Sequence, residues 1–152
     1  MLKRLVPDVE SAIQPGKVSL VVTFSEAEIE AARRLRRSGL WWEPSVGHYV
    51  YDKTGFCKQA SPFQENVYFI LNYPYFMRAV GGVERFKEIM LWLPTWDDLR
   101  GVIHRFGVSD VDVACFLRER KAIESGQELL ALYELVESCL VKAVTTPATP
   151  RD

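Results

Sequence analysis

The stretch from Leu91 to Gly107 constrains the fold most, because it specifies a helix together with both of its ends. Thr95 can accept hydrogen bonds from the free amide groups of the first turn, where Asp97 and Asp98 place negative charge at the positive end of the helix dipole. Gly107 marks the end of the helix. At about 100° per residue, one face holds Trp96, Leu99, Val102, Ile103 and Phe106. The segment therefore predicts an amphipathic helix that packs against other elements.

The chain before this helix predicts a strand, a helix and a meander. Residues 18–24 show the two-residue period of a half-buried strand. Ser25 and Glu28 then have the spacing of a capping box, which predicts a helix that ends at Gly39.

A β-hairpin is expected next, because two aromatic segments flank a turn at 45–47. Its strands would be residues 40–44 and 48–52, and a short further strand is expected near 56–58. Alternation in the second strand places Tyr49 and Tyr51 on one face of the sheet.

Residues 61–72 can be interpreted in two ways. Ser61, Pro62 and Gln64 occupy the cap, first and third positions of a helix start, so we favour a helix from 62 to about 72. The apolar run from Val67 to Leu71 is equally compatible with a buried strand.

The remainder of the chain predicts helices. Further helices are expected from Pro74 to the glycine pair at 81–82, over 83–89, from the Ser109 cap to about 124, and from a Ser125 cap to about 143. The apolar side of the last helix extends over about half of its circumference. A single packing partner could not cover all of it. We therefore expect it to lie deep in the core or to pair with a second copy of the chain in a homo-oligomer.

These elements predict the α+β class, with a small antiparallel sheet and one helix within about 18–58 and a mostly helical part within about 62–144. With 152 residues, of which 48% are hydrophobic, the chain can form one domain around a single core. We expect an N-terminal arm at 1–16 and a disordered tail at 145–152.

Composition and charge exclude several function classes. The net charge of -1 lacks the basic excess of a nucleic-acid-binding protein, and Glu30 is placed to pair with Arg33 and Arg34 in the arginine-rich stretch 33–37. We therefore expect no nucleic-acid partner. The N-terminus has no apolar run typical of a signal peptide or membrane anchor, so we expect no membrane association and a cytoplasmic location.

Metal and nucleotide chemistry lack their usual motifs. Cys57, Cys115 and Cys139 form no CxxC pair, and the only histidines are His48 and His104. Phosphate-binding glycine motifs are also missing from the sequence. We therefore expect neither a metal site nor a cofactor.

The aromatic residues suggest a binding site, because most of them lie between Trp41 and Phe76. Such a cluster can form a core, line a pocket for a small apolar ligand, or anchor a protein partner. Neighbouring residues of a strand point to opposite faces, so Trp41 and Trp42 cannot both be covered by one side of the sheet. We expect a non-catalytic binding surface formed by Trp41, Trp42, Glu43, His48, Tyr49, Tyr51 and Asp52.

The alternative is a small hydrolase or thiol-dependent enzyme. His48 could activate Cys57 as a nucleophile if the two side chains meet, and Glu43 with Asp52 could act as an acid and a base. No catalytic motif surrounds these residues, so we favour the binding module.

Overall fold

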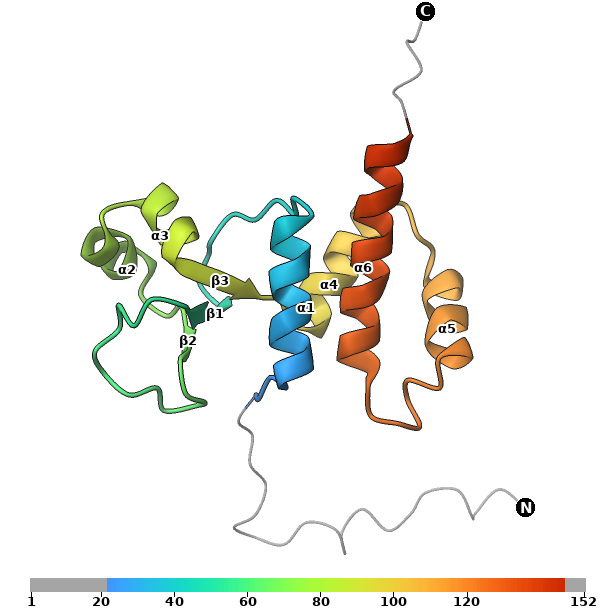
Figure 1. Ribbon diagram of the computed structural model, residues 1–152, viewed down its shortest axis with the longest axis horizontal. Helices are drawn as coiled ribbons and strands as arrows, with labels where there is room; N and C mark the ends of the chain where they lie inside the picture. The colour runs from blue at the N-terminus through green and yellow to red at the C-terminus, as the bar shows by residue number, and fades with distance from the viewer. Residues whose placement is uncertain (1–21, 147–152) are drawn as a thin grey trace, which may run out of the picture.

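The computed structural model describes residues 22–146, in which six helices and three short strands form an α+β fold, as predicted (Figure 1). The elements are α1 (Glu26–Arg37), β1 (Tyr49–Asp52), β2 (Val67–Phe69), α2 (Tyr73–Val80), α3 (Val83–Ile89), β3 (Met90–Leu93), α4 (Trp96–Arg105), α5 (Asp110–Glu119) and α6 (Glu128–Thr145). None of these helices is both long enough and apolar enough to cross a membrane.

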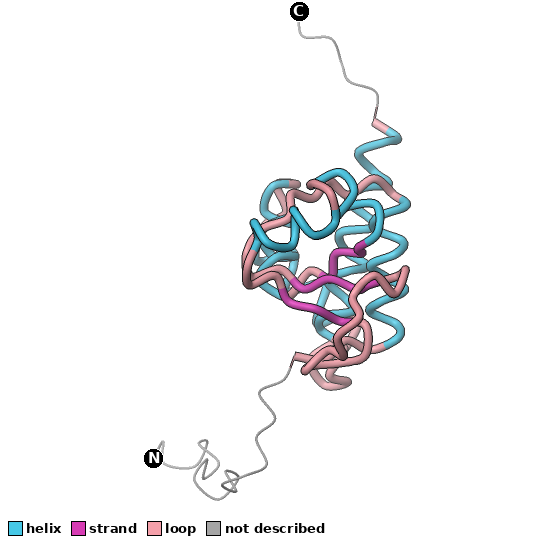
Figure 2. Tube along the Cα trace, turned by 90° about the vertical axis from the view of Figure 1, so that its left-hand side faces the viewer, coloured by secondary structure: helices cyan, strands magenta, loops and turns pink. Residues whose placement is uncertain are grey.

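The three strands form an antiparallel sheet in the order β2-β1-β3, with β1 in the centre. Val50 of β1 lies opposite Tyr68 of β2 and Trp92 of β3, so these three side chains share one face. Tyr49 and Tyr51 point to the other face. Figure 2 shows the strands crossing the body of the domain.

Each face of the sheet is covered by its own set of helices. Leu91 and Leu93 belong to a buried cluster with residues of α1, α4 and α6. Val50 and Met90 belong to a second cluster, which includes Phe86 of α3. Figure 1 shows α1 and α6 side by side, with α2 and α3 at the far end of β3.

The predicted helix starts at Ser25 and Thr95 are confirmed. The Ser25 amide donates to the Glu28 carboxylate at 2.8 Å, and the Glu28 amide donates back to the Ser25 hydroxyl at 3.2 Å. Thr95 and Asp98 form the same reciprocal pair at the start of α4. Beyond α4, Gly107 adopts a φ of 76°, a left-handed conformation that suits glycine at a helix end.

The predicted hairpin is wrong. Residues 40–44 form no strand, and β1 pairs instead with β2 and with β3, a strand that the sequence analysis did not identify. The reason is burial: the run Met90–Leu93 is apolar at every position and fits beside β1, where both of its faces are covered. In residues 40–44, Pro44 also lacks the amide that a strand partner requires.

The predicted helix at 62–72 is also wrong, and the strand alternative holds for Val67–Phe69. The expected cap residues make tertiary contacts instead. The Gln64 side chain accepts from the Phe24 amide at 2.8 Å and donates to the Phe24 carbonyl at 2.8 Å, and the Ser61 hydroxyl donates to the Val67 carbonyl. The two bonds of Gln64 attach the segment to the start of α1, which a local sequence pattern does not reveal.

Three smaller expectations need correction. Residues 56–58 are not a strand, because the Asp52 carboxylate accepts from the Cys57 amide at 2.8 Å and holds this segment as a loop. The helix from Ser109 ends at Glu119. The N-cap residue of α6 is Gln127 and not Ser125, and the Gln127 side chain forms no capping hydrogen bond.

The termini lie largely outside the described part of the chain. Residues 22–24 do not form the end of a strand, and the remainder of the strand expected at 18–24 is outside the described residues. The arm at 1–16 is outside them as well, as is most of the tail at 145–152, although Thr145 is the last residue of α6.

The broad apolar side of α6 is covered within the chain along most of its length. Leu132, Tyr133 and Val136 are buried against α1 and α4. Near the end of the helix, Val141 is 55% exposed and Val144 is 82% exposed. Self-association through this helix stays a prediction, and these two valines are the exposed large apolar residues of α6 that a second copy could cover.

Tyr133 offers a test of how α6 is fixed to the sheet. Its buried hydroxyl donates to the Pro94 carbonyl at 2.8 Å, at the junction between β3 and α4. Tyr133→Phe should lower the free energy of unfolding by about 1 to 2 kcal/mol, because the buried carbonyl loses its partner. Tyr75→Phe, at an exposed position of α2, should change it by less than about 0.5 kcal/mol. Urea denaturation measures both, and equal effects would contradict the assigned role of the Tyr133 bond.

Candidate functional site

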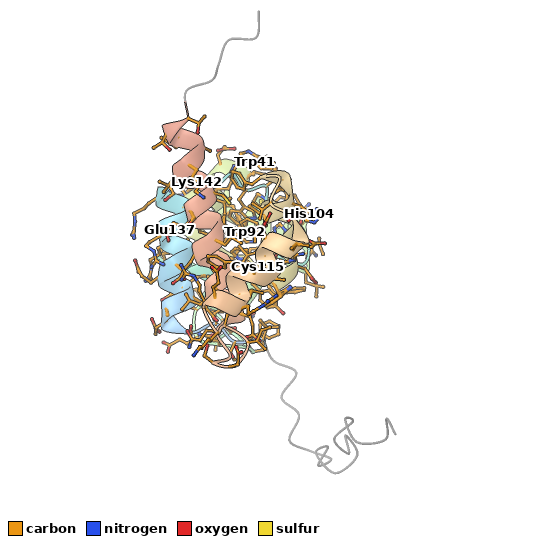
Figure 3. The ribbon with its side chains drawn as sticks, turned by 90° about the vertical axis from the view of Figure 1, so that its right-hand side faces the viewer. Trp41, Trp92, His104, Cys115, Glu137 and Lys142 are labelled. Carbon is orange, nitrogen blue, oxygen red and sulfur yellow. The ribbon has the colours of Figure 1, made fainter. Side chains whose placement is uncertain are left out.

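The segment after α1 places two adjacent tryptophans in opposite environments. Gly39, with a φ of 85°, ends α1, and the Leu40 amide donates to the Leu35 carbonyl at 3.0 Å. The chain then turns so that Trp41 is 68% exposed whereas Trp42 is only 8% exposed. Figure 3 shows Trp41 at the upper edge of the domain, toward the C-terminal end of α6.

The buried Trp42 is held by His48. Its indole Nε1 donates to His48 Nδ1 at 2.9 Å, and the Ser45 amide approaches the same nitrogen at 3.3 Å. An indole N–H can only donate, so Nδ1 must be unprotonated and the neutral ring carries its proton on Nε2. That nitrogen lies 3.9 Å from Asp98 Oδ1.

Burial lowers the pKa of His48 below its usual value, although the nearby Asp98 charge opposes this shift. The geometry leads to the same conclusion, because protonating Nδ1 would break the bond from Trp42. His48 is therefore a neutral support for Trp42, and this favours a positioning role over that of a general base.

Trp42 also joins the segment to β3. Its ring lies parallel to that of Trp92, with 4° between the planes and 5.8 Å between the centroids, and Phe86 of α3 lies 5.9 Å away. Together with the exposed Trp41, these two indoles form the walls of two neighbouring hollows.

The first hollow, which we call the basic hollow, has a volume of about 340 Å³. It lies between the end of α1, residues 39–42 and β3. Its lining is Ala32, Leu35, Arg36, Gly39, Leu40, Trp41, Trp42, Lys87, Met90, Leu91, Trp92 and Pro94. Two cations and no carboxylate are therefore present in an otherwise apolar lining.

Arg36 is fixed at the edge of the basic hollow. Its guanidinium donates to the Met90 carbonyl at 3.2 Å and to the Glu88 carbonyl at 3.3 Å. A guanidinium has five N–H donors, so these bonds orient the group and leave donors for a ligand. Within residues 22–146, neither Arg36 nor Lys87 forms an ion pair.

The second hollow, which we call the acidic hollow, has a volume of about 280 Å³ and shares the same three indoles. Besides Trp41, Trp42 and Trp92, its lining is Glu43, His48, Asp97, Asp98, Gly101 and Arg105. Three carboxylates are therefore opposed by one guanidinium.

The structure brings only part of the predicted binding surface together. Trp41, Trp42, Glu43 and His48 line the acidic hollow. Tyr49 and Tyr51 lie on the opposite face of the sheet, where Tyr49 contacts the rings of Phe24, Phe63 and Phe69, and Arg33 lies 5.5 Å from the Tyr51 ring centroid.

Asp52 has a structural role. Its buried carboxylate accepts from the amides of Thr54 at 3.0 Å and Cys57 at 2.8 Å. Burial alone would raise the pKa of Asp52, but backbone hydrogen bonds from Cys57, Thr54 and Phe56 outweigh it and lower the pKa. The ionised carboxylate thus organises the loop after β1.

The predicted Cys57–His48 pair gains no support from the geometry. Burial, with the Asp52 charge and a hydrogen bond to it, raises the pKa of Cys57 to about 11, the opposite of what a nucleophilic thiol requires. His48 and Cys57 flank opposite ends of β1, and they share no hydrogen bond within the described part of the chain.

Three of the four arginines of α1 have acidic partners close by. Arg33 and Arg37 pair with Glu30, each at 3.1 Å, and Arg34 pairs with Glu137 of α6 at 3.1 Å. These contacts occupy groups that would otherwise be available to phosphates. The absence of a nucleic-acid partner stays a prediction.

Sequence reasoning missed Lys87, Trp92 and Arg105 as residues of this region. The apolar run containing Trp92 could have been identified as a strand, since three apolar neighbours adjoin it and Pro94 follows. No sequence signal connects Lys87 or Arg105 with Trp41, because only the packing of α3 and α4 brings them together. Among the residues that the structure describes, no group of three or more His, Cys, Asp or Glu side chains could hold a metal ion.

Comparison of this chain with protein-family models, with curated proteins and with solved structures gives no match.

The bond between Trp42 and His48 predicts a specific pH dependence. The unfolded chain binds a proton at His48 below its ordinary pKa of 6.5, whereas the folded chain resists protonation, so stability should fall as the pH drops below that value. One proton contributes a slope of at most about 1.4 kcal/mol per pH unit. Denaturant unfolding between neutral and mildly acidic pH measures the effect.

His48→Gln should remove this part of the pH dependence, because the amide oxygen can still accept from Trp42 but does not titrate. His104→Gln is the matched control at an exposed position and should retain it. An unchanged acid response in His48→Gln would contradict the assignment.

Proposed function

We propose that this protein is a non-catalytic binding module that takes a small apolar anion, such as an aromatic carboxylate, in the basic hollow. The observation that carries this function is the combination of an apolar lining with Arg36 and Lys87 and without a carboxylate. A carboxylic acid with an aromatic or branched apolar part matches both properties.

The size and walls of the basic hollow support an apolar ligand. Its volume of about 340 Å³ falls within the usual range of ligand pockets. Trp41 exposes most of its ring without a covering side chain, although Trp42 and Trp92 next to it are packed. A ligand ring placed against Trp41 would remove apolar surface from water on both partners.

The charges near the hollow support an anion. Among the residues that line the hollow itself, the only charged groups are Arg36 and Lys87, both cations. Arg36, already oriented by two carbonyl groups, needs little reorganisation to donate to a carboxylate.

Phenylacetate and phenylacetamide test this function directly, because the two molecules have nearly the same shape and differ in charge. Isothermal titration calorimetry should show phenylacetate binding at least tenfold more tightly, a difference of about 1.4 kcal/mol. Equal binding of the two, or binding of neither, would contradict the proposed anion site.

Variants locate the binding. Lys87→Gln should weaken phenylacetate about fivefold through the lost charge, and Trp41→Ala should weaken it about tenfold through lost ring contact. Trp96→Phe is the matched control, because this exposed tryptophan of α4 lies outside both hollows. Trp41 is exposed, so its replacement should leave the melting temperature nearly unchanged.

A further inference from the structure

We infer that the acidic hollow is a second site, which binds an alkylated ammonium group such as a trimethylammonium cation. The site has two properties that such a cation requires together: an open indole face for the alkyl groups and carboxylates for the charge. It goes beyond the proposed function because it requires the opposite ligand charge and different charged residues.

The aromatic part of the site consists of Trp41, Trp42 and Trp92, all of which line the acidic hollow. Tryptophan is the most favourable ring for a cation, because its π face carries negative charge. Trp42 and Trp92 stack on each other, and Trp42 is only 8% exposed, so the indole face open to a cation is that of Trp41, which is 68% exposed. Trp42 is fixed by its bond to His48, so the wall beside Trp41 is in place before a ligand arrives, which lowers the entropic cost of binding.

The carboxylates give the hollow an excess of negative charge. Within residues 22–146, neither Glu43 nor Asp97 forms an ion pair. Asp98 is partly occupied, since its Oδ2 accepts from the Thr95 amide and hydroxyl at the start of α4. Glu43 and Asp97 are thus the carboxylates left for a ligand.

The positive groups near the hollow do not cancel this charge. His48 is neutral, because its Nδ1 accepts from Trp42. Arg105 is the one permanent cation in the lining, against three carboxylates. A quaternary ammonium fits better than a metal ion, because it needs ring contact and diffuse charge, whereas a hard cation needs several oxygen ligands at short distance.

Choline and dimethylbutanol form a matched pair of probes, because a neutral tert-butyl group replaces the trimethylammonium group in the second molecule. Calorimetric titration of the full chain at low ionic strength should show choline binding at least tenfold more tightly, a difference of about 1.4 kcal/mol. Equal affinity for both probes, or no binding of choline, would overturn the site.

Substitutions assign the binding to this hollow. The double variant Glu43→Gln with Asp97→Asn should weaken choline about tenfold, and Glu119→Gln on the exposed side of α5 should leave it unchanged. Unfolding curves confirm that each variant is folded. If the folded double variant kept its affinity for choline, the assignment would be wrong.

The variants distinguish a wrong assignment of the basic hollow from a wrong assignment of the acidic hollow. Lys87→Gln should weaken phenylacetate without affecting choline, because Lys87 lines only the basic hollow. The double variant of Glu43 and Asp97 should weaken choline without affecting phenylacetate, because these carboxylates line only the acidic hollow. Trp41→Ala should weaken both ligands, because its ring belongs to both walls.

Discussion

The pairing of β3 with β1 is the interaction on which the remaining structure depends. β3 lies along the central strand and covers both layers of the core, because Leu91 and Leu93 face one cluster of helices whereas Met90 faces the other. It also connects α3 directly to Pro94 and α4. Without this strand, the sheet would consist of two strands, which are rarely stable in water.

The same strand creates the candidate site. Trp92 stacks on Trp42, and this contact draws the segment after α1 against the sheet. Since Trp42 points inward and is held by His48, its neighbour Trp41 is directed to the surface. The two hollows are thus a consequence of how one irregular segment joins α1 to β1, and they share their indole walls but differ in charge.

Local signals predicted the helices well and the sheet poorly. Ser25, Thr95 and Gly107 act through bonds or backbone conformations within a few residues, so their effect could be inferred from the sequence. Ser61 and Gln64 carry the same kind of signal but bond to Val67 and Phe24 instead. A cap pattern does not distinguish these outcomes, because the competing partner of Gln64 is 40 positions away.

The sequence by itself determined the α+β class, the ends of most helices and the presence of an unusual aromatic segment. It identified Trp41, Trp42, Glu43 and His48 as neighbours because they are close along the chain. Only the tertiary structure decided that Tyr49, Tyr51 and Asp52 serve the core and the loop, and that Arg36, Lys87, Trp92 and Asp97 complete the two hollows. The physical reason is that helix ends depend on short-range hydrogen bonds, whereas strand pairing and pockets depend on the apolar surface that distant segments bury together.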